Sequence, residues 1–173
     1  MSGYRAFTTN DDDLVCRIEY YPTPQRWRDN IDSTNPITDE KNWSAEIRYM
    51  NPTNDDVSDE IKKIPNNTGG VYMFYIKGIS LPFVEKYIVY IGRAYYTDDQ
   101  NIRKRAKEYL KPDRELIKHL FSHWKEYLYY RYYSDVNNDQ IKANEAMLIR
   151  AILPPFNEDI PNKIEVKTPI KAF

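Results

Sequence analysis

Glu145 is a charged residue on the apolar face of a predicted helix. Four apolar residues share its face of the helix predicted there: Ile141, Leu148, Ile149 and Ile152. Burying a carboxylate is costly unless a cation, a hydrogen-bond donor or a metal ion compensates for its charge. The spacing therefore leaves two interpretations: Glu145 is a metal ligand, or it is a structural residue that is either partly exposed at the edge of the stripe or paired with an arginine at the rim of the core.

Arg105 and Tyr109 lie one helical turn apart, so their side chains point the same way. A guanidinium group can donate two parallel hydrogen bonds to a phosphate, although a solvated basic face would explain Arg105 equally well. Tyr72 and Tyr90 fall in strand-like segments, where tyrosines usually serve as core or cross-strand partners. A tyrosine with an ordinary pKa of about 10 can accept a proton only if a nearby cation lowers that pKa or if the proton is passed on.

Six elements are predicted to position these residues, in the order β-β-α-α-β-α. The strands are rich in β-branched and aromatic residues and cover 71–76, 87–91 and 127–133. The helices carry apolar residues at helical spacing and cover 102–110, 116–124 and 140–153. Pro112 and Pro154 end the first and third helices.

Caps and alternation add detail to this prediction. Asp98 or Asp99 is predicted to cap the first helix, and Asp113 the second. Alternation along the second strand places Tyr90 and Ile88 on the same face of the sheet.

Between residues 70 and 157, roughly half of the chain, these features resemble the GIY-YIG nuclease superfamily. Gly70-Val71-Tyr72 is similar to the first signature of that family, and Tyr90-Ile91-Gly92 matches the second. The similarity continues with Asn101-Ile102-Arg103-Lys104-Arg105 for the arginine helix, Tyr109 where many members have histidine, Asn144-Glu145-Ala146 for the metal-binding glutamate, and Pro155-Phe156-Asn157 for the closing Pro-x-Asn. The connection between the two signatures and the loop between Gly92 and Asn101 are both longer than usual in the family.

The resemblance implies an α+β fold in which helices flank a three-stranded antiparallel sheet, with the site on one face of the sheet. It implies one Mg²⁺ or Mn²⁺ ion per active site, held by Glu145 against the leaving 3′ oxygen. Tyr72 would be the general base, Arg105 would bind a phosphate oxygen and Asn157 would fix the geometry of the site. The catalytic residues so implied are Tyr72, Tyr90, Arg105, Tyr109, Glu145 and Asn157.

The net charge of −1 does not by itself indicate a polyanionic partner. Charge is unevenly distributed, however: residues 1–66 carry 8 basic and 13 acidic side chains, whereas residues 86–133 carry 11 and 6. The basic half is where a phosphate backbone would lie, although two solvated faces would produce the same asymmetry. The candidate nucleic-acid-binding residues are Arg93, Arg103, Lys104, Lys107 and Lys118 in the basic half, with Arg26 and Arg28 as base-reading candidates in the acidic half.

The length of 173 residues predicts one core with an extension. We expect an irregular N-terminal arm over 1–66 with strand-like runs at 14–21 and 43–50, a catalytic domain over 67–160 and a tail over 161–173. The only cysteine, Cys16, excludes an internal disulfide and favours a reducing compartment. No apolar run is long enough for a membrane span, so the expected location is the cytoplasm.

A metal-dependent endonuclease of the type II restriction kind is the leading functional prediction, because only the arm is available to add sequence specificity. A single site cuts one strand, so double-strand cleavage would require a homodimer or two sequential nicks. The alternatives are a phage-defence or toxin nuclease that acts with a protein partner, and a non-catalytic nucleic-acid-binding module. The sequence predicts DNA as the partner and does not exclude RNA.

Overall fold

A computed structural model of the chain describes residues 6–10, 13–17, 24–53, 55–77 and 87–162. Within these ranges, no helix has both the length and the apolar character that crossing a membrane requires. Residues 163–173 of the predicted tail lie outside the described residues, as do residues 18–21 of the first strand-like run.

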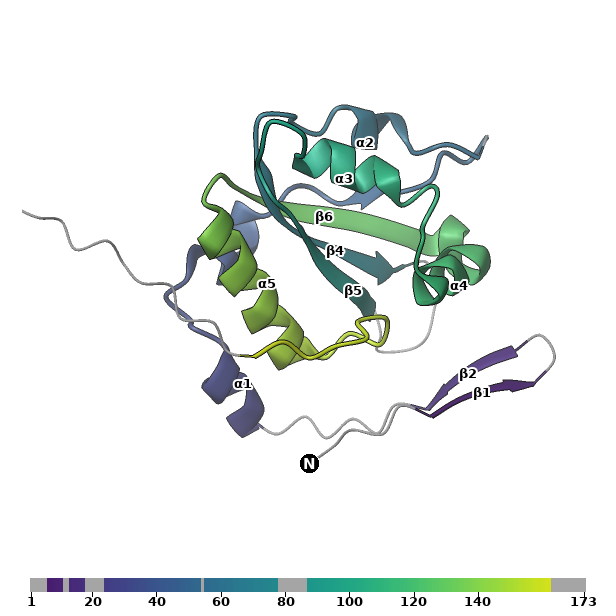
Figure 1. Ribbon diagram of the computed structural model, residues 1–173, viewed down its shortest axis with the longest axis horizontal. Helices are drawn as coiled ribbons and strands as arrows, with labels where there is room; N and C mark the ends of the chain where they lie inside the picture. The colour runs from purple at the N-terminus through teal and green to yellow at the C-terminus, as the bar shows by residue number, and fades with distance from the viewer. Residues whose placement is uncertain (1–5, 11–12, 18–23, 54, 78–86, 163–173) are drawn as a thin grey trace, which may run out of the picture.

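An antiparallel sheet forms the centre of the fold (Figure 1). Its strand order is β3-β6-β4-β5, so β4 is hydrogen-bonded to β5 on one side and to β6 on the other. The strand bounds are Ile47–Arg48 for β3, Gly69–Ile76 for β4, Tyr87–Ala94 for β5 and Leu128–Asp135 for β6. The expected α+β architecture with an antiparallel sheet flanked by helices is therefore present.

The expectation of three strands is wrong, because the described sheet has four. β3 pairs with β6 through Ile47 opposite Tyr130 and Arg48 opposite Tyr129, and thereby covers an edge that would otherwise expose unpaired backbone groups. β3 is only two residues long. Alternation in the run 43–50 indicates a strand there, but alternation along one strand does not reveal which strand it pairs with.

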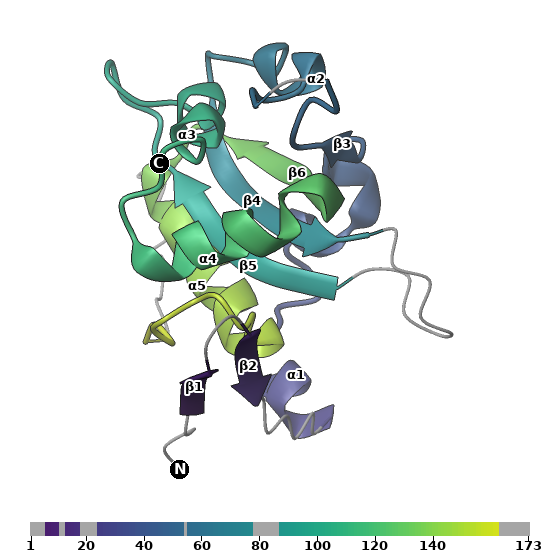
Figure 2. The same ribbon diagram turned by 90° about the vertical axis from the view of Figure 1, so that its right-hand side faces the viewer.

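Helices cover both faces of the sheet (Figures 1 and 2). One core combines residues of α3 and α4 with Tyr72, Phe74 and Tyr130 from the sheet, and the other combines α5 with Val71 and Ile91. The bounds are Pro24–Asn30 for α1, Asp59–Lys62 for α2, Ile102–Glu108 for α3, Glu115–Trp124 for α4 and Asn138–Ile152 for α5. Short 3₁₀ turns cover Pro36–Thr38, Glu40–Asn42 and Lys125–Tyr127, and β1 (Ala6–Asn10) forms an antiparallel hairpin with β2 (Asp13–Arg17).

A bulge in β5 overturns the prediction that Tyr90 and Ile88 share a face. Phe74 pairs with Tyr90 but the next residue, Tyr75, pairs with Ile88, so Val89 is an extra residue in β5. Tyr90 and Val89 consequently pack in the core beneath α3 and α4, whereas Ile88 packs on the α5 side. The regular pairing of Tyr72 with Gly92 and of Phe74 with Tyr90 keeps Tyr90 on the face of Tyr72, and the bulge turns Ile88 to the opposite face.

The predicted aspartate caps are also wrong. Asn101 caps α3, because its side-chain oxygen accepts a hydrogen bond from the backbone N–H of Lys104 at 2.9 Å. An N-cap must directly precede the first helical turn, and Asp98 and Asp99 lie too far upstream. α4 begins after Arg114 and has no side-chain cap, which leaves Asp113 outside it.

Part of the expected N-terminal arm is integral to the cores. Ile37 packs on the α5 side of the sheet, and Tyr49 and Ile61 pack on the other side. The buried hydroxyl of Tyr49 also donates a 2.7 Å hydrogen bond to the carbonyl of Ala106 in α3. The boundary at residue 66 stays a prediction, but residues 37–64 are not separable from the sheet without exposing apolar surface.

Candidate active site

The expected catalytic side chains meet at the edge strand β5. A cleft of about 500 Å³ lies there and is lined from both faces of the sheet, by tyrosines of β4 and β5 and by residues of α3 and α5. Five of the six expected catalytic residues line the cleft, and Tyr109 contacts it through hydrogen bonds to two of them. The lining residues of most interest are Tyr72, Tyr90, Arg93, Arg105, Arg114, Glu145 and Asn157.

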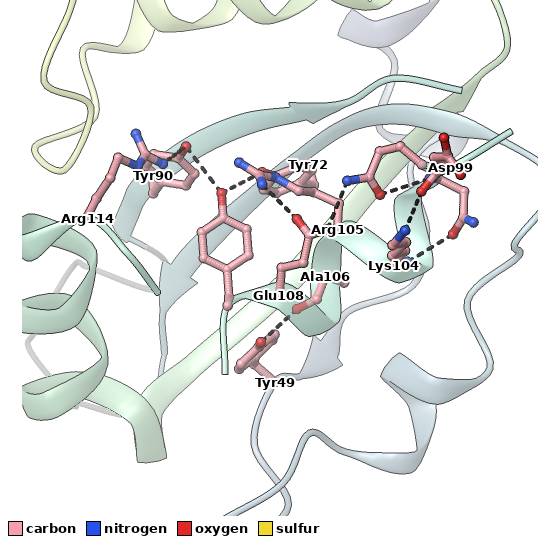
Figure 3. Close-up of polar contacts among 12 residues, drawn as sticks. Tyr49, Tyr72, Tyr90, Asp99, Lys104, Arg105, Ala106, Glu108 and Arg114 are labelled. Atoms are coloured by element: carbon pink, nitrogen blue, oxygen red, sulfur yellow. Dashed lines mark hydrogen bonds and ion pairs between the residues drawn. The ribbon is translucent and has the colours of Figure 1, made fainter. Parts of the chain in front are cut away.

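Tyr72, Tyr109 and Tyr90 form a chain of hydroxyl groups. The Tyr72 and Tyr109 oxygens are 2.6 Å apart, and the Tyr109 hydroxyl donates to Tyr90 Oη at 3.3 Å. Arginines flank both ends, because Arg105 Nε donates to Tyr72 Oη at 3.2 Å and Arg114 Nη2 donates to Tyr90 Oη at 2.6 Å (Figure 3). Tyr90 Oη therefore accepts two hydrogen bonds and retains its own proton for a group in the cleft.

The surroundings of Tyr72 and Tyr109 favour the protonated form of both hydroxyl groups. Tyr72 is fully buried, and burial raises its pKa well above the usual value of 10, assisted by the neighbouring Tyr90 and opposed by Arg105. Burial likewise raises the pKa of Tyr109 well above that value. Both phenols are accordingly held protonated, so they serve as links in the hydroxyl chain.

Gly92 makes room for the Tyr72 hydroxyl. The two residues are register partners, and a Cβ placed on Gly92 would come within 2.5 Å of Tyr72 Oη and 2.6 Å of Tyr72 Cζ. Gly70 is the glycine of the Gly70-Val71-Tyr72 motif. Its φ is +148°, and a Cβ placed on it would lie 2.0 Å from the carbonyl oxygen of Tyr133. The two glycines therefore allow close packing between neighbouring strands.

Replacing Gly92 by alanine is expected to displace the Tyr72 ring and break its contact with Tyr109. We expect a loss of about 1–3 kcal/mol in the free energy of unfolding, as for other overpacked sites. Urea denaturation of Gly92→Ala in the wild-type and Tyr72→Phe backgrounds checks this. The loss should be smaller in the Tyr72→Phe background, which lacks the nearest atom, and equal losses in both would rule out the proposed clash.

Glu145 lies on the buried face of α5, with 8% of its surface exposed. Burial raises the pKa of its carboxyl above the usual value of 4.5, although the nearby Arg93 opposes this. The Arg93 guanidinium forms an ion pair with the carboxylate through Nη1. Both interpretations from the sequence thus have support in the geometry, because Glu145 faces a cleft and also has an arginine partner.

The donor set is compatible with one divalent ion. Among the described residues, no group of three or more His, Cys, Asp or Glu side chains is arranged to hold a metal, so an all-protein cage is absent there. Mg²⁺ retains several waters and takes phosphate oxygens, so one carboxylate can suffice. The Arg93 guanidinium already contacts the Glu145 carboxylate. This contact shows that positive charge is accommodated beside Glu145, as a metal ion would require.

Asn157 connects the segment after α5 to the edge strand β5 through two hydrogen bonds. Its Oδ1 accepts from the backbone N–H of Ile91 at 2.9 Å, and its Nδ2 donates to the Ile91 carbonyl at 2.8 Å. The adjacent Phe156 N–H donates to the Val89 carbonyl at 3.0 Å. Asn157 therefore satisfies backbone groups of β5 that have no neighbouring strand, and this is suited to fixing the geometry of the site.

The expected nucleic-acid-binding residues are dispersed. Arg93 lines the cleft, whereas Arg103 donates to the Ile64 carbonyl and Lys118 pairs with Glu115 at 3.1 Å. Lys104 and Lys107 are exposed on α3, Arg28 is exposed on α1, and the side chain of Arg26 lies outside the described residues. Among the members of this set whose side chains are described, Arg93 alone therefore lines the cleft.

Arg114 is a cleft residue that was not predicted from the sequence to belong to the site. It follows the helix-ending Lys111-Pro112 pair, and no periodicity relates it to Tyr90. Its position in the basic half of the chain was the only available signal.

Comparison with known proteins gives a limited result. No protein-family model matches the chain, and no curated protein matches it. Among solved structures, the chain is similar to the GIY-YIG N-terminal endonuclease domain of UvrC from Thermotoga maritima, a tyrosine-to-phenylalanine point mutant bound to the catalytic divalent cation. The sequence identity is 22% and the TM-score 0.41, over 60% of this chain and 100% of that one. The roles of individual residues therefore rest on the geometry of the cleft.

Proposed function

We propose that the protein is a metal-dependent endonuclease that hydrolyses phosphodiester bonds in DNA. The observation that carries this proposal is the convergence, in one cleft, of a hydroxyl chain ending at Tyr90, a carboxylate at Glu145 and several arginines. Phosphodiester hydrolysis requires a proton acceptor for water, positive charge around the phosphate and stabilisation of the leaving oxygen. Each requirement has a candidate group in the cleft.

The role of proton acceptor is better assigned to Tyr90 than to Tyr72. A Tyr90 phenolate would keep both of its present donors, Tyr109 and Arg114, and Arg114 would also compensate for its negative charge. Tyr72 lies at the buried end of the chain, where burial raises its pKa. We therefore assign the Tyr90 phenolate, formed when the hydroxyl releases its proton to solvent in the cleft, to accept the proton of the attacking water, and Tyr72 and Tyr109 to orient the Tyr90 oxygen.

Glu145 is the proposed metal ligand. A bound Mg²⁺ or Mn²⁺ ion would supply positive charge to the phosphate and to the leaving oxygen. Arg93, which pairs with Glu145 in the structure, would exchange that carboxylate for a phosphate oxygen of the substrate. Arg105 also lines the cleft and would hold a non-bridging phosphate oxygen.

Removing the Arg93 charge is expected to tighten metal binding while weakening DNA binding. The side chain is about one-third exposed, at 36%, and such ion pairs contribute about 1 kcal/mol or less. We therefore expect Arg93→Met to bind Mn²⁺ roughly two- to fivefold more tightly, as measured by calorimetry without DNA. An unchanged Mn²⁺ affinity would show that Arg93 does not compete for Glu145.

The restriction-like subtype is a further proposal. It is supported by α1, which carries Arg28 and packs against α5, so residues upstream of the sheet are held close to the catalytic unit. A homodimer would bring two sites together for double-strand cleavage. Incubating the protein with a mixed-sequence plasmid tests the subtype, since discrete fragments with one common end sequence are expected and a continuous smear would exclude it.

A nuclease that depends on a protein partner is the second candidate, because residues 1–66 carry the excess of acidic side chains. Deleting all 66 residues would remove β3 and core residues such as Tyr49, so the informative deletion stops at residue 30, which removes α1 with Arg28 and spares both. Loss of sequence choice in that deletion favours restriction, whereas loss of a bound protein favours the partner-dependent nuclease.

A further inference from the structure

Arg114 lies where two hollows meet. Its guanidinium carbon is 5.3 Å from the centroid of the Tyr90 ring, and its Nη2 donates to the Tyr90 hydroxyl (Figure 3). Besides the cleft at β5, Arg114 lines a hollow of about 350 Å³ between α3 and α4. Arg105 also lines both hollows, so the two arginines form the boundary between them.

The charge of Arg114 differs from the charges of the other cleft arginines. Arg93 is paired with Glu145, and Arg105 Nη1 donates to Glu108 at 2.7 Å. Within the described part of the chain, Arg114 forms no ion pair, and the Tyr90 hydroxyl is the polar group it contacts. An arginine has five N–H donors, so most of those on Arg114 remain available to a ligand.

The ligand chemistry follows from these features. An uncompensated guanidinium with several free donors, set between two hollows beside a second arginine, suits an oxyanion that accepts paired hydrogen bonds. A DNA strand that passes from one hollow to the other would carry its phosphates past both arginines. Any phosphate held by Arg114 would then lie next to the Tyr90 hydroxyl.

We propose that Arg114 is a further active-site residue that binds a phosphate of the substrate strand and also positions the Tyr90 hydroxyl for proton transfer. The inference rests on the proposed nuclease function, and it assigns two separable effects to one side chain. The phosphate contact acts on DNA affinity and its salt dependence. The contact with Tyr90 acts on the rate of cleavage.

Two substitutions separate the effects. Arg114→Met removes both the charge and the donors. We therefore expect the salt slope, which is the slope of the logarithm of DNA affinity against the logarithm of salt concentration, to decrease in magnitude by about one. We also expect the cleavage rate to fall at least about tenfold. Arg114→Lys keeps a point charge but lacks the planar fork, so we expect it to retain the salt slope and to recover only part of the rate. Arg114 is exposed, and thermal melts should show both variants folded.

Lys142→Met provides the matched control for loss of one positive charge. Lys142 is exposed on α5 and does not line the cleft, so its salt slope and cleavage rate should equal those of the wild type. The slope is measured on metal-free protein with a duplex DNA at several salt concentrations, and the rate with saturating DNA and Mg²⁺.

A double-mutant cycle with Tyr90→Phe tests the positioning effect. Once the hydroxyl is absent, Arg114→Met should lower the rate by less than it does in the wild type, while still reducing the salt slope. Fully additive rate effects would overturn the positioning role, and an unchanged slope would overturn the phosphate contact. If the wild type itself neither binds nor cleaves DNA, the proposed function fails. A wild type that does both, with an Arg114→Met variant that matches it, contradicts the Arg114 assignment alone.

Discussion

Replacing Glu145 by glutamine is expected to abolish metal-dependent cleavage and to leave the fold as stable as the wild type or slightly more stable. The carboxylate is buried among apolar residues of α5, and burial raises its pKa despite Arg93. A raised pKa means that the folded protein disfavours the charged form, so a neutral amide removes an unfavourable term at neutral pH. The Arg93 guanidinium left behind is partly exposed and can be hydrated.

Thermal melts without metal and a cleavage assay with Mg²⁺ decide between the two roles of Glu145. A structural salt bridge predicts the opposite result for stability, since breaking a buried pair costs about 3–5 kcal/mol when a charge is left buried. Arg93→Met is the matched comparison, because it leaves the more buried member of the pair without a partner and should destabilise the fold more than Glu145→Gln. A large loss of stability in Glu145→Gln with cleavage retained would remove the metal-ligand assignment.

Replacing Tyr90 by phenylalanine is expected to lower the cleavage rate by roughly 10²-fold or more, as for loss of a general base. The substitution keeps the ring, which packs against Tyr72 and Phe74, so the fold should remain stable. Tyr72→Phe is the matched control, because it deletes another hydroxyl of the same chain. Its loss of contacts to Tyr109 and Arg105 should cost about 1 kcal/mol per hydrogen bond and a smaller part of the rate.

The ranking of the two tyrosine variants is the informative result. Single-turnover rates with saturating DNA separate the chemical step from binding. If Tyr72→Phe is the slower variant and Tyr90→Phe cleaves almost normally, the base is Tyr72, as the sequence resemblance implied. Equal losses would indicate that the hydroxyl chain acts as a unit.

The order of the elements around the site was predictable because each carries a strong local pattern. The β-branched and aromatic residues after Gly70 predicted β4, and helical spacing of apolar residues predicted α5, with Pro154 ending it. The apolar face of α5 was predicted from the same spacing, and so was the place of Glu145 on that face, whereas spacing left open whether Glu145 is buried or partly exposed. Which roles these residues have stays a prediction.

Several features were not predictable because they depend on contacts between distant segments. The bulge at Val89 is a matter of strand register, which alternation along one strand does not reveal. The pairing of Arg93 with Glu145 joins β5 to α5, and the contact of Arg114 with Tyr90 joins the residue before α4 to β5. Side-chain spacing in the sequence contains no information about either pair.

The most direct test of the central claim is cleavage of supercoiled plasmid DNA by the purified wild-type protein, with Mg²⁺ in one arm and excess chelator in the other. We expect nicked or linear product with Mg²⁺ only, at a rate that falls steeply with added salt because phosphate contacts release counterions. Glu145→Gln in parallel excludes a contaminating nuclease. Intact plasmid in the Mg²⁺ arm, with Mn²⁺ equally ineffective, would contradict the nuclease assignment, and so would cleavage that persists in chelator or in Glu145→Gln.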